Sequence, residues 1–168
     1  MIDLADVPRR GATLLVGIDG AGGAGKSTLA SKLTDKIVAM DDFVTAPWEW
    51  YDFERLRRHV LEPLQRDEHA RYQRLDWKTG ELTEWQTVEP GGVVAVEGVA
   101  ALDRRLREAY DFRIWVETPQ EICFARGLDR DGADALPLWE AWSAKEQRYW
   151  AKQHPRESAD AIVDGSGS

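Results

Sequence analysis

Short runs of consecutive apolar residues alternate along the chain with segments in which apolar side chains recur every three or four positions. The unbroken runs occupy residues 13–18, 36–40, 92–98, 112–117 and, more weakly, 160–163. Such runs are typical of parallel strands that are buried on both faces. The segments with helical spacing occupy residues 26–33, 103–110, 119–131 and 136–153. The alternation predicts an α/β fold, doubly wound around a five-stranded parallel sheet.

One segment, residues 43–91, breaks this alternation. Apolar residues recur at helical spacing over 53–64, where Asp52 is placed as the N-cap and Pro63 is expected to kink or end the helix. Residues 71–89 then read as a β-hairpin. Because ligands bind at the carboxyl ends of parallel strands, we expect this helix-plus-hairpin insertion to cover a substrate.

Composition restricts the class of protein. The chain has 168 residues, which favours a single domain over 1–168, and its 43% hydrophobic content is ordinary for a globular protein. A net charge of -8 argues against a nucleic-acid partner. No apolar run is long enough to span a bilayer, and the amino-terminal residues do not resemble a secretory signal. With Cys123 as the single cysteine, these features favour a cytoplasmic protein without a membrane partner, and they leave the oligomeric state open. The final GSGS is expected to be a flexible tail that need not be native.

Residues 17–30 read GIDGAGGAGKSTLA, which fits two glycine-rich motifs. Gly20, Gly25, Lys26 and Ser27 match the phosphate-binding P-loop, G-x-x-x-x-G-K-[ST]. The glycines alone also match the dinucleotide fingerprint G-x-G-x-x-G, and an acidic pair about 20 residues later could bind a ribose. Lys26 and Ser27 favour the P-loop, because an NTP site uses an ammonium on the β/γ-phosphates and a hydroxyl on Mg²⁺. The residues expected to bind ATP or another NTP are Gly20, Ala21, Gly22, Gly23, Ala24, Gly25, Lys26, Ser27 and Thr28.

Four stretches in this order, GAGGAGKSTLA, MDDF, VVAVEGV and ARGLDRDG, resemble the uridine kinase-like branch of the P-loop small-molecule kinases. The resemblance extends over roughly residues 13–163 and implies a nucleoside/nucleotide-kinase-like P-loop NTPase fold. It also implies Mg²⁺- and ATP-dependent phosphoryl transfer to a hydroxyl of a small metabolite, most simply a nucleoside-like acceptor.

The resemblance also assigns roles to individual residues. Asp41 would be the general base, with Asp42 as the other candidate, and a carboxylate at a strand end beside the γ-phosphate suits that task. Glu97 would hold Mg²⁺ together with Ser27. Arg126 and Arg130 would belong to a short lid over residues 126–137 that closes on the NTP and stabilises charge during transfer.

Aromatic residues gather in the insertion and could form a wall for a planar or sugar-like acceptor, or a small satellite core. They are Trp48, Trp50, Tyr51, Tyr72, Trp77 and Trp85. Relatives use a tyrosine and an aspartate from a similar hairpin, for which Tyr72 and Asp76 are available. The expected acceptor-binding residues are Asp41, Tyr51, Tyr72, Arg74, Asp76 and Trp77. In the carboxyl-terminal helix, Trp139, Trp142 and Tyr149 are expected to face the core.

Two other function classes stay open at this stage. One is a nucleotide-dependent switch or accessory NTPase without a small acceptor, although the chain lacks the guanine motif N/T-K-x-D. The other is a dinucleotide-binding oxidoreductase. No pair among His59, His69 and His154 has the spacing of metal ligands, so Mg²⁺ is expected only with the nucleotide.

Overall fold

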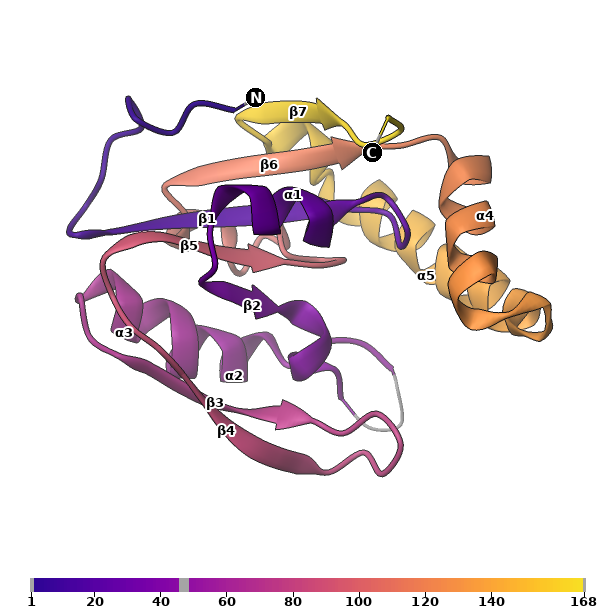
Figure 1. The fold of residues 1–168 in the computed structure, drawn as a ribbon, viewed down its shortest axis with the longest axis horizontal. Coiled ribbons are helices and arrows are strands. Elements are labelled where there is room, and N and C mark those ends of the chain that lie inside the picture. Colours follow the sequence, from indigo (N-terminus) through magenta and orange to yellow (C-terminus); the bar gives the residue numbers. More distant parts are fainter. Residues whose placement is uncertain (1, 46–48, 168) are drawn as a thin grey trace.

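The computed structural model describes residues 2–45 and 49–167, and a parallel sheet of five strands forms its centre (Figure 1). The strands lie side by side in the order β2-β5-β1-β6-β7, and each neighbouring pair is parallel. Their bounds are β1 Thr13–Gly20, β2 Ile37–Ala39, β5 Gly92–Glu97, β6 Phe112–Glu117 and β7 Ala161–Asp164. The five predicted strands and the doubly wound α/β class are confirmed.

Both faces of the sheet are covered, which explains the unbroken apolar runs. All eight residues of β1 are buried. Leu14, Val16 and Ile18 face a core shared with α1, Lys26–Leu33, whereas Leu15 faces the core of the opposite side. Figure 1 shows α1 in front of the sheet and α5, Leu136–Gln153, behind it. The remaining long helix, α4 Gln120–Asp131, follows the carboxyl end of β6.

The insertion forms as predicted, except at Pro63. Helix α2, Phe53–Leu56, begins after Asp52, whose side chain accepts a hydrogen bond from the Arg55 N–H at 2.9 Å. A π-helical turn over Arg57–Leu61 leads into α3, Glu62–Gln65, so the helix continues through Pro63 and ends at Gln65 instead of stopping at the proline. The wide turn lies just before Pro63 and accommodates the residue that cannot donate a backbone hydrogen bond.

The hairpin that follows the helix is an antiparallel pair. Its strands are β3, Ala70–Leu75, and β4, Leu82–Val88, and they form a sheet of their own below the main sheet in Figure 1. The helical part and β3 pack onto the core, whereas most of β4 is exposed.

Two further expectations about local structure were wrong. Residues 103–110 form turns and the short 3-10 helix Arg107–Ala109 instead of an α-helix. The Asp103 side chain bonds to the N–H and the guanidinium of Arg105, and the backbone closes in tight turns such as Leu106 N–H to Asp103 O. The GSGS tail is not uniformly loose either, because Gly165 is buried and donates its N–H to Glu117 O at 2.9 Å.

Among the described residues no helix is both long and apolar enough to cross a membrane.

Candidate active site

The glycine-rich loop joins β1 to α1 at the carboxyl edge of the sheet. Gly23 and Gly25 adopt positive φ values of 80° and 97°, a region that glycine enters without strain. A Cβ on Gly23 would also lie 2.5 Å from the carbonyl oxygen of Cys123 in α4, so only glycine fits there. The loop ends at the amino terminus of α1, where free N–H groups and the helix dipole favour an anion.

A cavity of about 870 Å³ opens in front of this loop. It is large enough for a nucleotide together with a second small molecule. Its walls come from the P-loop, the 3-10 helix Met40–Phe43, the end of β5, the hairpin and the facing helices α4 and α5. The residues of interest that line it are Gly22, Gly23, Gly25, Lys26, Ser27, Thr28, Asp41, Tyr51, Trp77, Glu97, Arg126, Arg130, Trp139 and Trp142.

Ser27 and Glu97 meet at the floor of this cavity. The Ser27 hydroxyl donates to Glu97 Oε1 at 3.0 Å, although the two residues lie 70 positions apart. Burial raises the pKa of Glu97, and Lys26 and the Ser27 hydrogen bond oppose that rise. A hydroxyl and a carboxylate are hard oxygen ligands that fit Mg²⁺, which usually takes one or two protein oxygens plus phosphates and waters. No group of three or more His, Cys, Asp or Glu in the described part of the chain could hold a metal by itself.

Lys26 is buried among carboxylates. Its ammonium donates to the Ala21 carbonyl oxygen at 2.7 Å. Burial raises the pKa of four acidic groups around it, namely Asp19, Asp41, Glu97 and Glu146, and the charge of Lys26 opposes that rise. The lysine is therefore held at the loop by fixed charge rather than left mobile on the surface.

The neighbouring carboxylates Asp41 and Asp42 face different surroundings. Asp41 is exposed to the cavity, and its pKa is raised by desolvation against the opposing pull of Lys26. Asp42 is buried, accepts the Leu75 N–H at 3.4 Å and pairs with Arg74 at 3.6 Å. Asp42 thus ties the hairpin to the main domain, and Asp41 is the carboxylate that a ligand in the cavity would meet.

The two arginines of α4 both line the cavity but have different partners. Arg126 donates to the carbonyl oxygens of Gly165 at 2.9 Å and Ser166 at 3.1 Å, so it holds the end of the chain against the P-loop. Arg130 pairs with Asp131 at 2.8 Å and is exposed. Its guanidinium still opposes, more weakly than Lys26, the rise that desolvation gives the pKa of Asp41.

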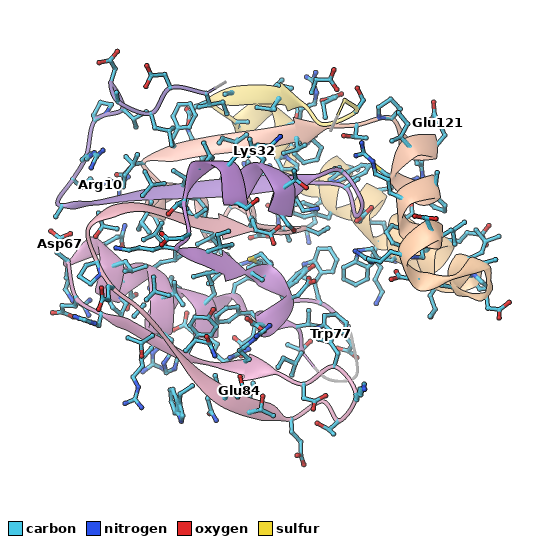
Figure 2. All side chains as sticks on the ribbon, viewed as in Figure 1. Arg10, Lys32, Asp67, Trp77, Glu84 and Glu121 are labelled. Carbon is cyan, nitrogen blue, oxygen red and sulfur yellow. The ribbon has the colours of Figure 1, made fainter. Side chains whose placement is uncertain are left out.

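On the side of the insertion, Tyr51 and Trp77 line the cavity. Tyr51 is 5% exposed, and its hydroxyl has no hydrogen-bond partner among the described residues. Burial raises its pKa, and the nearby carboxylates of Asp41 and Asp19 add to that effect. Trp77 is 48% exposed, and Figure 2 shows it at the tip of the hairpin.

The other expected acceptor residues lie elsewhere. Tyr72 packs into the core with its ring 5.1 Å from that of Phe43. Asp76 accepts the Lys78 N–H at 2.7 Å and so closes the hairpin turn, and Arg74 pairs with Asp42. These three side chains do not line the cavity, because the hairpin uses them to hold its own shape and its attachment. Trp48 lies outside the described residues.

Two buried carboxylates have structural roles at the P-loop that the sequence patterns did not single out. Asp19, at the end of β1, is fully buried and accepts the Tyr149 hydroxyl at 2.6 Å and the N–H groups of Leu102 and Ala100 at 2.9 and 3.2 Å. Glu146 of α5 accepts the Gly22 N–H at 2.8 Å. An acidic residue at a strand end beside the loop could have indicated Asp19. No local signal connects Glu146 to a loop 124 residues away.

Helix α5 was expected to turn Trp139, Trp142 and Tyr149 to the core, which holds for Tyr149 and in part for Trp142, since Trp142 packs against the same core cluster. Tyr149 is 5% exposed. Trp139 and Trp142 are half-buried and line the cavity. Trp142 also packs against Trp50, with ring centroids 5.7 Å apart, so this helix and the insertion meet beside the cavity.

Comparison with known proteins places this site in a family. Residues 39–135, more than half of the chain, match the model of the Phosphoribulokinase / Uridine kinase family. A uridine kinase of Proteus mirabilis is 33% identical over an alignment that covers 70% of this chain and 68% of that protein. A phosphoribulokinase of Synechocystis sp. is 26% identical, covering 89% of this chain and 53% of that protein. The chain spans about two thirds of the length of the curated uridine kinases that it matches.

Solved structures share the whole fold. A possible uridine kinase from Bacillus stearothermophilus superposes with a TM-score of 0.68 at 21% identity over 92% of this chain and 90% of that one. A candidate fructose transport system kinase from Silicibacter sp. TM1040 gives a TM-score of 0.67 at 27% identity over 92% and 91%. The chain therefore belongs to the Phosphoribulokinase / Uridine kinase family of P-loop phosphotransferases.

Proposed function

We propose that this protein transfers the γ-phosphoryl group of ATP to a hydroxyl of a small, uncharged, nucleoside-like acceptor, with Mg²⁺ as the required ion. One observation supports this more than any other. Lys26, the Ser27–Glu97 pair and Asp41 come from three separate parts of the chain and line one cavity. A cation for phosphates, oxygens for Mg²⁺ and a carboxylate for the acceptor are the parts that phosphoryl transfer needs.

Each group has a definite task in the transfer. Loop N–H groups and Lys26 bind the β- and γ-phosphates, and Ser27 with Glu97 would hold Mg²⁺, which supplies charge neutralisation when it is bound. The acceptor oxygen attacks the γ-phosphorus, and the bond to the β–γ bridging oxygen breaks, releasing ADP. Asp41 accepts the proton that the acceptor hydroxyl loses, and its raised pKa makes it a better base than an ordinary aspartate. Arg130 faces the same space and would stabilise charge on the group in transit.

The acceptor class follows from the wall opposite the P-loop. Tyr51, Trp77 and Trp142 provide aromatic surface there. The cationic side chains in the cavity lining are Lys26, Arg126 and Arg130, which lie on the P-loop and α4. Described residues of the insertion add no lysine or arginine to that lining, so a phosphate already on the acceptor would have no dedicated partner there.

The test is to incubate the protein with Mg²⁺ and ATP in a mixture of nucleosides, sugars, sugar phosphates and vitamins, and to search by mass spectrometry for compounds that gain one phosphate. Lys26→Ala protein is the blank. A nucleoside product absent from the blank would support the proposal. A phosphorylated sugar phosphate would contradict the acceptor class while leaving the kinase activity intact.

A result with no acceptor product would count against the kinase. If ATP binds but is only slowly hydrolysed, and a protein partner accelerates that hydrolysis, the function would be that of a switch NTPase instead of a kinase.

A further inference from the structure

A second cavity, of about 280 Å³, lies behind the P-loop. It is enclosed by the end of β6, the start of α4, the inner face of α5 and the turn at residues 155–157. Figure 1 shows α5 passing behind the carboxyl ends of the strands, where this space is found. Its lining shares only Gly22 and Trp139 with that of the large cavity. Gly22 belongs to the phosphate-binding loop, but its N–H is bonded to Glu146. None of the side chains assigned above to phosphoryl transfer borders this cavity.

The walls of this second cavity are largely aromatic. Trp115 of β6 and Trp150 of α5 meet edge to face, with ring centroids 5.9 Å apart. Phe124 and Trp139 form a second pair at 5.9 Å. The faces of aromatic rings carry partial negative charge, so a lining with four such rings can attract a cation.

The charged groups around the cavity are mainly acidic. Its lining includes three carboxylates, on Glu117, Glu146 and Glu157, and one guanidinium, on Arg156. Arg156 already pairs with Glu117 at 2.7 Å, so its charge is neutralised. No described residue forms a hydrogen bond or an ion pair with the Glu157 side chain, and Glu146 receives the neutral Gly22 N–H. Glu146 also lies near Lys26, whose single charge it shares with Asp19, Asp41 and Glu97. Among the described lining residues, Glu157 therefore remains the carboxylate without a close counter-ion.

The two cavities on either side of Gly22 thus differ in their balance of charge. The front cavity places Lys26, two arginines and loop N–H groups, which attract phosphate, beside three carboxylates, on Asp41, Glu97 and Asp131. The rear cavity combines aromatic faces with excess carboxylate, which repels anions and attracts cations. A bare metal ion is a poor match, since no cluster of three or more metal-ligating side chains occurs in the described residues.

We propose that the rear cavity is a binding site for a small organic cation of the ammonium class. The positively charged group lies among the aromatic side chains, and Glu157 supplies the opposing charge. The volume limits the ligand to a compact amine or methylated ammonium.

Tetramethylammonium is the probe for this site, and its methyl signal in ligand-observed NMR reports saturable binding. tert-Butanol, of similar shape but uncharged, and K⁺, charged but without methyl groups, are the comparison compounds. We expect saturable binding of tetramethylammonium, at least about tenfold tighter than of tert-butanol, and displacement by excess K⁺ only at far higher concentration. Equal binding of tert-butanol, or no saturable binding, would overturn the proposal.

Two variants locate the site on the protein. Glu157→Gln removes one charge from an exposed side chain without changing its shape and should weaken binding about threefold to tenfold. Trp150→Leu removes one aromatic wall and should weaken it by about tenfold or more. Glu84→Gln and Trp85→Leu make the same changes on the exposed strand β4 and should leave binding unchanged.

Circular dichroism and thermal melting of each variant show whether it folds. If Trp150→Leu does not fold, the comparison of Glu157→Gln with Glu84→Gln is enough to test whether tetramethylammonium binds in the rear cavity. Equal affinities of those two variants would place tetramethylammonium elsewhere and overturn the assignment.

Discussion

At the scale of single residues, the contrast between Asp41 and Asp42 is the sharpest feature of the site. They are adjacent in sequence, yet Asp41 faces the cavity and Asp42 is buried against the hairpin. The sequence could not separate them, because both follow β2 in the same motif. The short 3-10 helix Met40–Phe43 rotates one side chain toward the ligand space and the other toward Leu75 and Arg74.

We expect Asp41→Asn to lower kcat by about 10² to 10⁴, since a carboxamide cannot accept the proton of the acceptor hydroxyl. The affinity for ATP should stay near that of the unchanged protein, because Asp41 is assigned to the acceptor and not to the phosphates. Steady-state kinetics and ATP titration measure the two effects separately.

Asp42→Asn is the matched control. It should keep turnover within a few-fold, because Asp42 does not line the cavity and instead pairs with Arg74 of the hairpin. If Asp42→Asn abolished turnover and Asp41→Asn preserved it, the assignment of the base would be reversed.

At the scale of elements, α5 reaches the P-loop at two positions one turn apart. Glu146 receives the Gly22 N–H, and Tyr149 donates to Asp19, which precedes Gly20. Both acidic side chains are at most 4% exposed, so water does not compete for these hydrogen bonds. We infer that α5 positions the P-loop from behind.

This role predicts different effects of two substitutions. Glu146→Gln keeps an oxygen that can accept the Gly22 N–H, whereas Glu146→Ala leaves that N–H unpaired. Both remove the same charge near Lys26, so their difference isolates the hydrogen bond. We expect the alanine variant to bind ATP about tenfold more weakly than the glutamine variant, with a smaller difference in kcat.

A purely structural role of Glu146 would give another result. The alanine variant would then have a lower melting temperature but the same KM for ATP as the glutamine variant. Measuring KM, kcat and melting temperature on both proteins separates the two cases.

Local sequence signals predicted most of the elements, and long-range contacts decided the rest. The strands were predictable because residues such as Leu14 to Ile18 are buried on both sides, which leaves an unbroken apolar run. The failure at 103–110 has a local cause that outweighed helical spacing, since the Asp103 side chain binds nearby backbone. Pairings such as Glu146 with Gly22, or Tyr72 with Phe43, depend on how distant segments pack and leave no pattern along the chain.

At the scale of the whole molecule, acidic groups surround the P-loop at a cost in stability. Burial raises the pKa of five carboxyl groups: Asp19, Asp41, Asp42, Glu97 and Glu146. A group with a raised pKa binds its proton more tightly in the folded state than in the unfolded state. Unfolding then releases protons, so the free energy of unfolding should increase as the pH falls from neutral. The increase should end when the pH approaches the ordinary pKa values of Asp and Glu, 3.8 and 4.5.

Other carboxylates determine the pH below which the protein stops gaining stability. Hydrogen bonds lower the pKa of Asp67, Asp131, Asp160 and Asp164, which therefore stabilise the fold above their ordinary pKa and lose that contribution when the pH falls below it. We expect the melting temperature of the ligand-free protein to rise from about pH 8 to a maximum near about pH 5, and to decline below it.

Repulsion among the surface charges, which sum to -8 at pH 7, also weakens as the pH falls and would raise the melting temperature too. The melting temperature should therefore be measured against pH in about 0.5 M salt, which screens exposed charges far more than buried ones. Glu146→Gln removes one of the five groups and should flatten the rise. A melting temperature that instead increased steadily from about pH 5 to about pH 8 would show that these carboxylates are better stabilised in the fold than their burial implies.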